Sequence, residues 1–242
     1  MIYKCILQYN GSAYSGWQKQ PGQITIQQVL EEALSIIHKS PVEVHGSGRT
    51  DKGVHAYGQV FHFESELNMD GQAFLRALNA LVPKSLKILS VEDSEGFHAR
   101  FDALSKTYIY RINTGERSVF DEDYVYQFNR SLDLDSMIEC AKLFIGSHDF
   151  TSFNATELTI IPNQIRKIEK VDIVRQGDIL QITLKADGFL RYMVRMLVAA
   201  LVEVGQGRLS IDDIQTILDA KDKDAFTKNV PSCGLYLLSV DY

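Results

Sequence analysis

A carboxylate between two cations, in a glycine-rich run, is the feature of this sequence best suited to chemistry. Asp51 lies between Arg49 and Lys52 within residues 46–55, GSGRTDKGVH. The three glycines of this run allow backbone shapes that residues with a Cβ resist, as loops at the rim of a cleft often require. Neighbouring cations keep a carboxylate ionised, which a nucleophile needs. The pattern predicts an active-site loop with Asp51 as nucleophile, although an aspartate that only bonds loop amides fits it as well.

Two other interpretations of this loop are weaker. A phosphate cradle is disfavoured because the GxGxxxxG spacing lacks a GK[ST] ending and the next segment has the pattern of a strand. A metal site built from His45, Asp51, His55 and His62 would show regular ligand spacing, which is missing here. We therefore expect no metal.

Two tyrosines on a basic strand are candidates for contact with a nucleobase. The run KTYIYR at 106–111 places Tyr108 and Tyr110 on one face of a strand, because strand side chains alternate. A flat ring on a strand that carries positive charge can stack on a base. The alternative, simple cross-strand packing, is expected for one of the two tyrosines.

A strongly apolar segment at 189–204 carries two arginines near its start. The segment is predicted to be helical, so Arg191 and Arg195 would share a face at a spacing of four residues. An unpaired buried charge is costly, so arginines on such a helix need a carboxylate or a phosphate partner. Asp51 is a natural partner for one of them.

Composition describes an ordinary globular protein with an acidic balance. The chain has 242 residues, 45% hydrophobic and 23% charged, and a net charge of −6, enough for one large domain or two packed halves. Negative charge opposes nucleic-acid binding, which relies on Lys and Arg. However, Arg100, Lys106, Arg111 and Arg117 face only two acidic residues between 100 and 117. A basic cleft in an acidic body is therefore possible.

Cysteine spacing and hydropathy limit the kinds of site and the cellular compartment expected for this chain. Cys5, Cys140 and Cys233 lie far apart without CxxC or CxxH spacing, so neither a zinc site nor a disulfide framework is expected. The first residues are too polar for a signal sequence, and no apolar run approaches the length of a membrane span. We expect a cytoplasmic protein that does not contact membranes.

The elements that must position these residues follow from periodicity. In the first hundred residues we predict strands at 2–9, 42–45, 57–64 and 86–92 with helices at 26–39 and 70–81, the βαββαβ order of a ferredoxin-like unit. In the rest we predict strands at 100–112, 124–128, 164–175, 178–186 and 234–240, with helices at 134–145 and 189–204 and one after Ser210. Thr25 with Gln28, and Ser210 with Asp213, have the spacing of a capping box at the start of a helix.

The two parts match in element order only, and no linker rich in proline or serine separates them. We therefore predict an α+β fold of two ferredoxin-like halves, 1–102 and 103–242, with pseudo-two-fold symmetry. The halves are expected to share a mixed, mainly antiparallel sheet with helices on one face and a central cleft on the other.

Seven motifs in register resemble the TruA family of tRNA pseudouridine synthases. They are YNGSAYSGWQKQ at 9–20, GRTDKGVHA at 48–56, FHARF at 97–101, KTYIY at 106–110, HDF at 148–150, MVR at 193–195 and GLYL at 234–237. Together they span essentially the whole chain.

The resemblance implies an isomerase that converts uridine to pseudouridine in the anticodon arm of tRNA, at tRNA positions 38, 39 and 40. It implies a homodimer without cofactor or metal, and it matches Asp51 to the nucleophile. Tyr108 would stack on the target base, Arg195 would pair with the aspartate, Arg49 would enter the space left by the flipped nucleotide, and Leu235 would form an apolar wall. Arg100, Lys106 and Arg191 are the further residues expected to contact RNA.

Some positions depart from the family pattern. Met196 and Ala199 stand where a polar residue and a glycine are expected, and NVPSC at 229–233 replaces a Thr-Ala-Pro segment. No proposed catalytic group is lost. The alternatives are a tRNA-binding or folding protein with narrow or secondary catalysis, and a metal-dependent nucleic-acid hydrolase that uses the histidines.

Overall fold

Alternating burial builds the sheet of the first unit, which comprises residues 1–104 and 236–242 of the 242 that the computed structural model describes. Strand β1 (Ile2–Tyr9) buries every second residue and lies between β3 (His55–Glu64) and β4 (Leu86–Asp93), antiparallel to both. Strand β2 (His45–Gly46) also pairs with β3. The chain returns to this unit at its end, because β10 (Leu235–Asp241) runs parallel to β3 with Tyr236 opposite His55.

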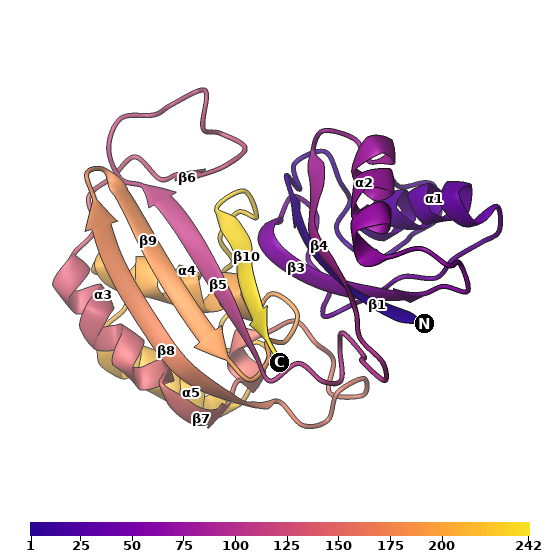
Figure 1. Ribbon diagram of the computed structural model, residues 1–242. Helices are drawn as coiled ribbons and strands as arrows, with labels where there is room; N and C mark the ends of the chain where they lie inside the picture. The colour runs from indigo at the N-terminus through magenta and orange to yellow at the C-terminus, as the bar shows by residue number, and fades with distance from the viewer. The chain divides into compact units, whose positions relative to one another are not determined.

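Two helices cover one face of this sheet (Figure 1). Helix α1 (Ile26–His38) begins at Thr25, whose side chain accepts from the Gln28 amide, as the capping pattern predicts. Helix α2 (Gly71–Leu81) begins at Asp70. Beneath them, the rings of Tyr3, Phe63 and Phe74 pack with centroids 4.7 to 5.3 Å apart. The predicted βαββαβ order is confirmed, with a second strand shorter than expected.

In the second unit, residues 105–235, the strands pair antiparallel in the order β5-β9-β8-β7, with the short β6 parallel to β5. The strands are β5 (Ser105–Asn113), β6 (Tyr126–Gln127), β7 (Gly146–Asp149), β8 (Ile165–Gln176) and β9 (Ile179–Ala186). On β9, Leu180, Ile182, Leu184 and Ala186 are fully buried.

Helix α4 (Met193–Gly205) is buried along almost its whole length and packs against α3 (Leu134–Ala141). Helix α5 (Ile211–Ala220) begins with the predicted capping box of Ser210 and Asp213. Two 3₁₀ turns, Lys142–Phe144 and Thr151–Phe153, complete the unit. Both units are mixed α+β with mainly antiparallel sheets, which confirms the predicted fold class. None of the helices is long and apolar enough to cross a lipid bilayer.

Three predicted boundaries are wrong by four or five residues. Strand β5 begins at Ser105 rather than at 100, because Asp102 closes a turn by accepting from and donating to His98. Helix α3 ends at Ala141, and Gly146, at a φ of 112°, starts β7 instead of following a helix to 145.

The third wrong boundary concerns α4, which begins at Met193 rather than at 189. Tyr192 is left-handed, with a φ of 62°. The Arg191 amide donates to Thr156 Oγ1, and its carbonyl accepts from the Ala155 amide. These groups are therefore unavailable for helical hydrogen bonds.

Candidate active site

The start of the Asp51 loop is tied to β3. The Ser47 amide donates to the Val60 carbonyl, and Ser47 Oγ donates to Gln59 Oε1 at 2.7 Å. Gln59 Nε2 donates in turn to the Gly48 carbonyl at 3.1 Å. Ser47 and Gln59 are fully buried, so these bonds are protected from water and hold the loop where it leaves the sheet.

The middle of the loop is held by residues 9–17, which we call the strap. The Trp17 amide donates to the Thr50 carbonyl at 3.0 Å, and Tyr9 shares a 2.7 Å hydrogen bond with Thr50 Oγ1. Burial raises the pKa of the Tyr9 phenol, so this hydroxyl stays protonated at neutral pH. The Val54 amide donates to the Asp51 carbonyl at 3.2 Å and closes a turn around the carboxylate.

Glycines let the strap lie directly on the loop. A Cβ on Gly11 would meet the Val54 carbonyl oxygen at 1.9 Å, and one on Gly16 would meet the Thr50 carbonyl oxygen at 2.6 Å. Gly16 also has a φ of 91°, which side chains rarely adopt. Asp51 itself is half-buried, while Arg49 and Lys52 are exposed. The loop therefore presents one carboxylate on a fixed backbone with two cations at the surface.

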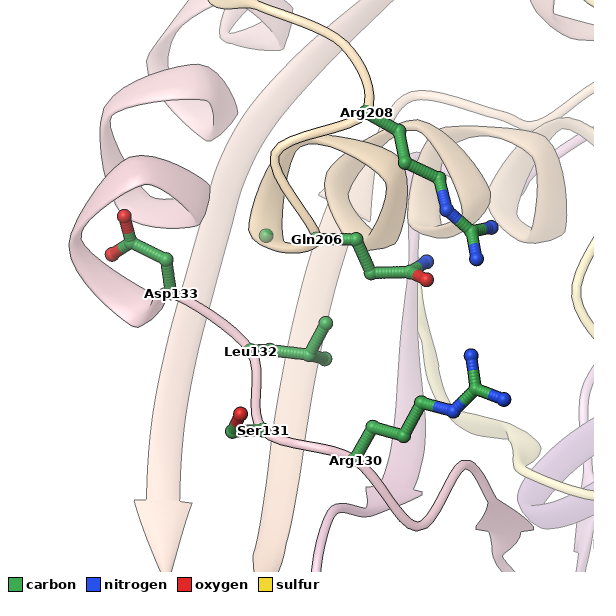
Figure 2. Close-up of a pocket in the computed structure, with 7 residues that line it drawn as sticks. Arg130, Ser131, Leu132, Asp133, Gln206 and Arg208 are labelled. Atoms are coloured by element: carbon green, nitrogen blue, oxygen red, sulfur yellow. The ribbon is translucent and has the colours of Figure 1, made fainter.

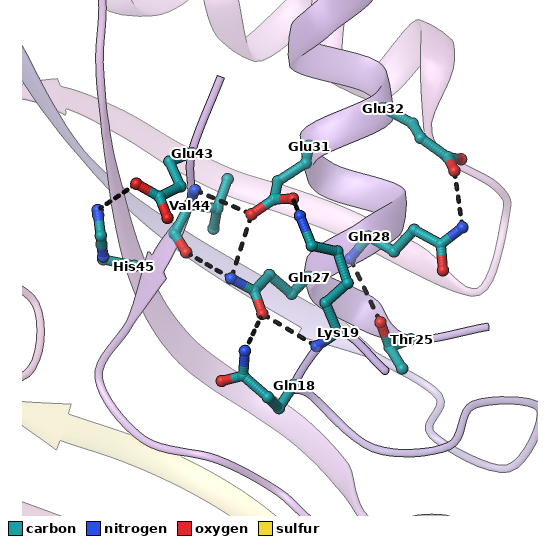
Figure 3. Close-up of polar contacts among 10 residues, drawn as sticks. All are labelled: Gln18, Lys19, Thr25, Gln27, Gln28, Glu31, Glu32, Glu43, Val44 and His45. Atoms are coloured by element: carbon teal, nitrogen blue, oxygen red, sulfur yellow. Dashed lines mark hydrogen bonds and ion pairs between the residues drawn. The ribbon is translucent and has the colours of Figure 1, made fainter. Parts of the chain in front are cut away.

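Behind the strap lies a polar network that the sequence analysis missed (Figure 3). Gln27, on α1, accepts from Gln18 Nε2 at 2.8 Å and from the Lys19 amide at 3.0 Å, and it donates to the Val44 carbonyl at 3.0 Å. Glu31, one turn later, accepts from Lys19 Nζ, the Gln27 amide group and the Val44 amide. The network joins residues 18–19, directly after the strap, to Val44 in the segment that enters the loop.

A signal for this network is present in the sequence. Gln27 and Glu31 stand four residues apart on the inward face of an amphipathic helix, among Ile26, Leu30 and Leu34. Polar side chains on a buried face require partners.

The histidines near the loop make structural contacts. His55 Nδ1 accepts from the Gly11 amide at 3.0 Å, and His62 Nδ1 accepts from the Ala99 amide at 3.1 Å. The rings of His45 and His62 stack at 4.9 Å. No group of three or more His, Cys, Asp or Glu side chains is arranged to hold a metal ion.

In the second unit, the two tyrosines of β5 differ. Tyr110 is fully buried and donates to the Pro231 carbonyl at 2.7 Å, so it is a packing residue. Tyr108 is 8% exposed and meets the Phe189 ring edge-on at 5.3 Å. Lys106, two residues earlier on the same strand, is half-buried. Leu235 is buried directly after Gly234, whose carbonyl accepts from the Arg111 amide.

Arg191 and Arg195 do not share a helical face, which corrects the prediction. Arg195 lies in the first turn of α4, half-buried, and its Nε donates to the Val230 carbonyl at 2.8 Å. Arg191 precedes the helix and is exposed. Both guanidinium groups lie against the Tyr192 ring, at 4.8 and 5.1 Å from its centroid.

The unusual residues around Arg195 occupy structural positions. Met196 and Ala199 are buried in the core along α4. Val230, from the divergent NVPSC segment, supplies the carbonyl that binds Arg195. These departures therefore retain the position of the arginine.

The structure thus places the predicted residues in two groups. Asp51, Arg49 and Arg100 belong to the first unit, where Arg100 lies in the exposed turn after His98 rather than on a strand. The second unit holds Tyr108, Lys106, Arg191, Arg195 and Leu235.

Comparison with known proteins finds one family throughout the chain. A family model described as tRNA pseudouridine synthase matches residues 6–102 and 140–242. A relative from Bacillus subtilis, named tRNA pseudouridine synthase A, is 42% identical over 246 residues, which covers 100% of this chain and 99% of the relative. Proteins of the same name from Geobacillus kaustophilus and Limosilactobacillus fermentum are each 41% identical over 99% of this chain. The chain therefore belongs to the tRNA pseudouridine synthase family and is an isomerase.

Proposed function

We propose that this protein converts uridine to pseudouridine in the anticodon stem-loop of tRNA, at tRNA positions 38, 39 and 40, with Asp51 as the nucleophile. The observation that carries the proposal is the strap, which fixes the backbone on both sides of a half-buried carboxylate through Gly11, Gly16 and Trp17. Preorganised geometry of this kind is what covalent catalysis requires. Full-length identity of 42% to a tRNA pseudouridine synthase A supports the substrate.

The reaction needs no cofactor by its own balance. The N1–C1′ glycosidic bond breaks, a C5–C1′ bond forms, the proton on C5 leaves and N1 gains a proton, so no atom or electron is supplied from outside. Asp51 would hold the reacting fragment covalently while uracil rotates and rejoins the ribose through carbon. The target base must first leave its stack, as in other enzymes that act on a base inside a helix.

The remaining residues take supporting roles in this proposal. Tyr108 stacks on the flipped base and assists proton transfer, and Leu235 forms an apolar wall beside it. Arg195, oriented by the Val230 carbonyl, pairs with Asp51 and keeps it ionised. Exposed Arg49 enters the space left by the base.

Backbone contacts and assembly complete the proposal. Arg100, Lys106 and Arg191 bind RNA phosphates, for which Arg and Lys are the usual partners. The proposal also divides the chain into two halves. The amino-terminal half, 1–102, carries the Asp51 loop, and the carboxy-terminal half, 103–242, completes the active site. The protein would act in the cytoplasm as a homodimer.

The proposal is tested with Asp51→Asn. An amide cannot act as the nucleophile, so pseudouridine formation should fall by a factor on the order of 10⁴ or more, while tRNA binding persists. Carbodiimide mapping of a tRNA transcript measures the product at each position, and Asp219→Asn, an exposed aspartate on α5, is the matched control. Product retained by Asp51→Asn would refute the nucleophile.

The positions are tested in cells. Mapping total tRNA with and without the gene should show loss of pseudouridine at positions 38, 39 and 40 only. An unchanged map, with wild-type protein that binds tRNA, would instead support the tRNA-binding or folding alternative.

A further inference from the structure

An open pocket of about 880 Å³ lies in the second unit, at the end of α4. One wall is segment 130–133 and the other is the turn after Gly205. Figure 2 shows Arg130 and Arg208 extending from these opposite walls toward the same space, with the Gln206 amide between them. Leu132 is the one aliphatic side chain in a lining otherwise polar or glycine, so the side-chain donors face an open, cationic space.

The charges of this pocket are not balanced by its carboxylates. No hydrogen bond or ion pair engages the Arg130 guanidinium. Arg208 Nη1 lies 3.6 Å from Glu203, but Glu203 also binds Lys228. Asp133 accepts from the Ser136 amide and hydroxyl as the cap of α3, and in Figure 2 its carboxylate points away from the arginines.

Among the residues that line the pocket, two arginines (Arg130 and Arg208) oppose one carboxylate (Asp133). The whole chain, by contrast, carries −6. A positive excess at one pocket of an acidic protein raises the local concentration of negative ligands.

Both walls of the pocket are fixed before any ligand arrives. The Asp133 amide donates to the Gly205 carbonyl at 2.8 Å and joins one wall to the other. A Cβ on Gly205 would lie 2.7 Å from Met137 Sδ, so glycine permits this close approach. Asn129, with a φ of 58°, bonds the carbonyls of Asn113 and Gly115 and thereby orients the chain into Arg130.

From this geometry we propose that Arg130, Gln206 and Arg208 bind a backbone phosphate of the RNA substrate. Planar guanidinium groups match phosphate oxygens in paired hydrogen bonds. Gln206 Nε2 donates one N–H to the Val202 carbonyl at 3.3 Å, and its second N–H adds a donor. Gln206 stands 11 residues after Arg195, about 16 Å along α4 at 1.5 Å per residue. The pocket therefore holds a part of the strand away from the reacting nucleotide, and this assignment rests on the proposed function.

The experiment measures the affinity of the full-length protein for an unmodified tRNA transcript across a series of salt concentrations. Arg130→Gln and Arg208→Gln should each weaken binding about tenfold, the effect of one charged hydrogen bond to the RNA. The slope of log affinity against log salt should become shallower by about 0.7 to 0.9 for each phosphate that the variant no longer binds. Turnover at saturating tRNA should not change, because the pocket lies away from the chemistry.

Arg175→Gln is the matched control. It removes the same charge from an exposed arginine of the same unit, on β8, and should change affinity less than about twofold. Arg208→Gln also removes a partner of Glu203 and could loosen the fold. Arg130→Gln breaks no hydrogen bond or ion pair. If Arg208→Gln lowers the melting temperature, the affinity of Arg130→Gln for tRNA alone tests the proposal.

The outcomes separate this proposal from the previous one. If the protein forms pseudouridine but Arg130→Gln leaves the tRNA affinity and the salt slope unchanged, the phosphate-binding proposal for this pocket is overturned and the proposed function is not. Wild-type protein whose tRNA affinity depends on Arg130 but which forms no pseudouridine would overturn the proposed function and support the pocket. Titration with inorganic phosphate is a further arm: phosphate binding that needs Arg130, with tRNA affinity unchanged, would assign the pocket to a free anion and overturn the proposal.

Discussion

The Asp51 loop and the start of α4 are both expected to serve one reaction, yet they are held in different ways. The loop is fixed by hydrogen bonds to buried partners and by glycines in backbone contact, as Gly11 and Gly16 show. Helix α4 is fixed mainly by burial of apolar side chains along its whole length. Polar contacts hold its two ends: Arg195 in the first turn binds the Val230 carbonyl, and Glu203 near the last turn pairs with Arg208 and Lys228.

The difference shows how each region tolerates change. Apolar packing accepts substitutions of similar volume at modest cost, so Met196 and Ala199 can depart from the family pattern without moving Arg195. A loop held by backbone contact and buried hydrogen bonds has no such freedom, because an added Cβ or an unpaired polar group cannot be absorbed. We therefore expect substitutions at the strap to have larger effects than equally small changes along α4.

The largest effect should come from Gly11→Ala. Its Cβ would lie 1.9 Å from the Val54 carbonyl oxygen, and both contacting groups are backbone. We expect a loss of about 3 kcal/mol in the free energy of unfolding and a severe loss of activity, as for strong overpacking. Urea denaturation measures the first. Gly188→Ala, where the nearest atom is 3.7 Å away, should be nearly neutral. Equal effects of the two substitutions would show that close contact between the strap and the loop does not stabilise the protein.

Arg195→Ala tests the polar contact at the start of α4. If Arg195 pairs with Asp51, its loss should lower turnover about 100-fold, or about 3 kcal/mol, since breaking a partly buried pair is costly. Arg191→Ala should raise KM for tRNA and leave kcat unchanged, because Arg191 is exposed and precedes the helix. Steady-state kinetics separate the two, and a kcat unaffected by Arg195→Ala would show that the proposed pair is wrong.

Gln27→Leu tests the network behind the strap. It removes the acceptor of Gln18 and Lys19 and the donor to Val44, leaving buried groups unpaired. We expect a loss of about 2 kcal/mol in stability and a lower kcat with KM for tRNA little changed, because the network positions the loop. The control is Gln28→Leu, which removes an exposed bond to Glu32. If both variants behave alike, the network does not support the loop.

The smallest effect concerns pH. Burial, with His45 and His98 nearby, lowers the pKa of His62 to about 4, against about 6.5 in an unfolded chain. The unfolded state therefore binds the extra proton first, and stability should fall as pH drops from 6.5 toward 4. His62→Asn keeps an acceptor for the Ala99 amide but does not titrate, so its stability should depend less on pH. Parallel curves for the two proteins would contradict this assignment.

Contiguous motifs made the Asp51 loop readable in the sequence. The glycines, the flanking cations and the following strand lie within 20 residues. The backbone freedom of glycine and the alternation of strand side chains act over such short distances, so they can be predicted without the tertiary structure. The order of strands and helices was likewise predictable except for β7, which the sequence analysis missed. An element that buries one face repeats apolar residues at the period of a helix or a strand, and this repeat can be seen in the sequence. Helix α1 and its Thr25 cap and the capping box of α5 are confirmed on this basis.

Long-range contacts explain what the sequence could not determine. Apolar periodicity continues through 189–192, but Ala155 and Thr156, some 35 residues earlier, bond Arg191 and keep it out of the helix. Tyr108 and Tyr110 are equivalent by alternation, and only Pro231, 121 residues beyond Tyr110, makes that tyrosine a packing residue. The sequence by itself determined the loop, the order of all elements but β7, and the family. Tertiary structure decided which polar groups find partners, because hydrogen bonds between distant segments leave no local periodicity.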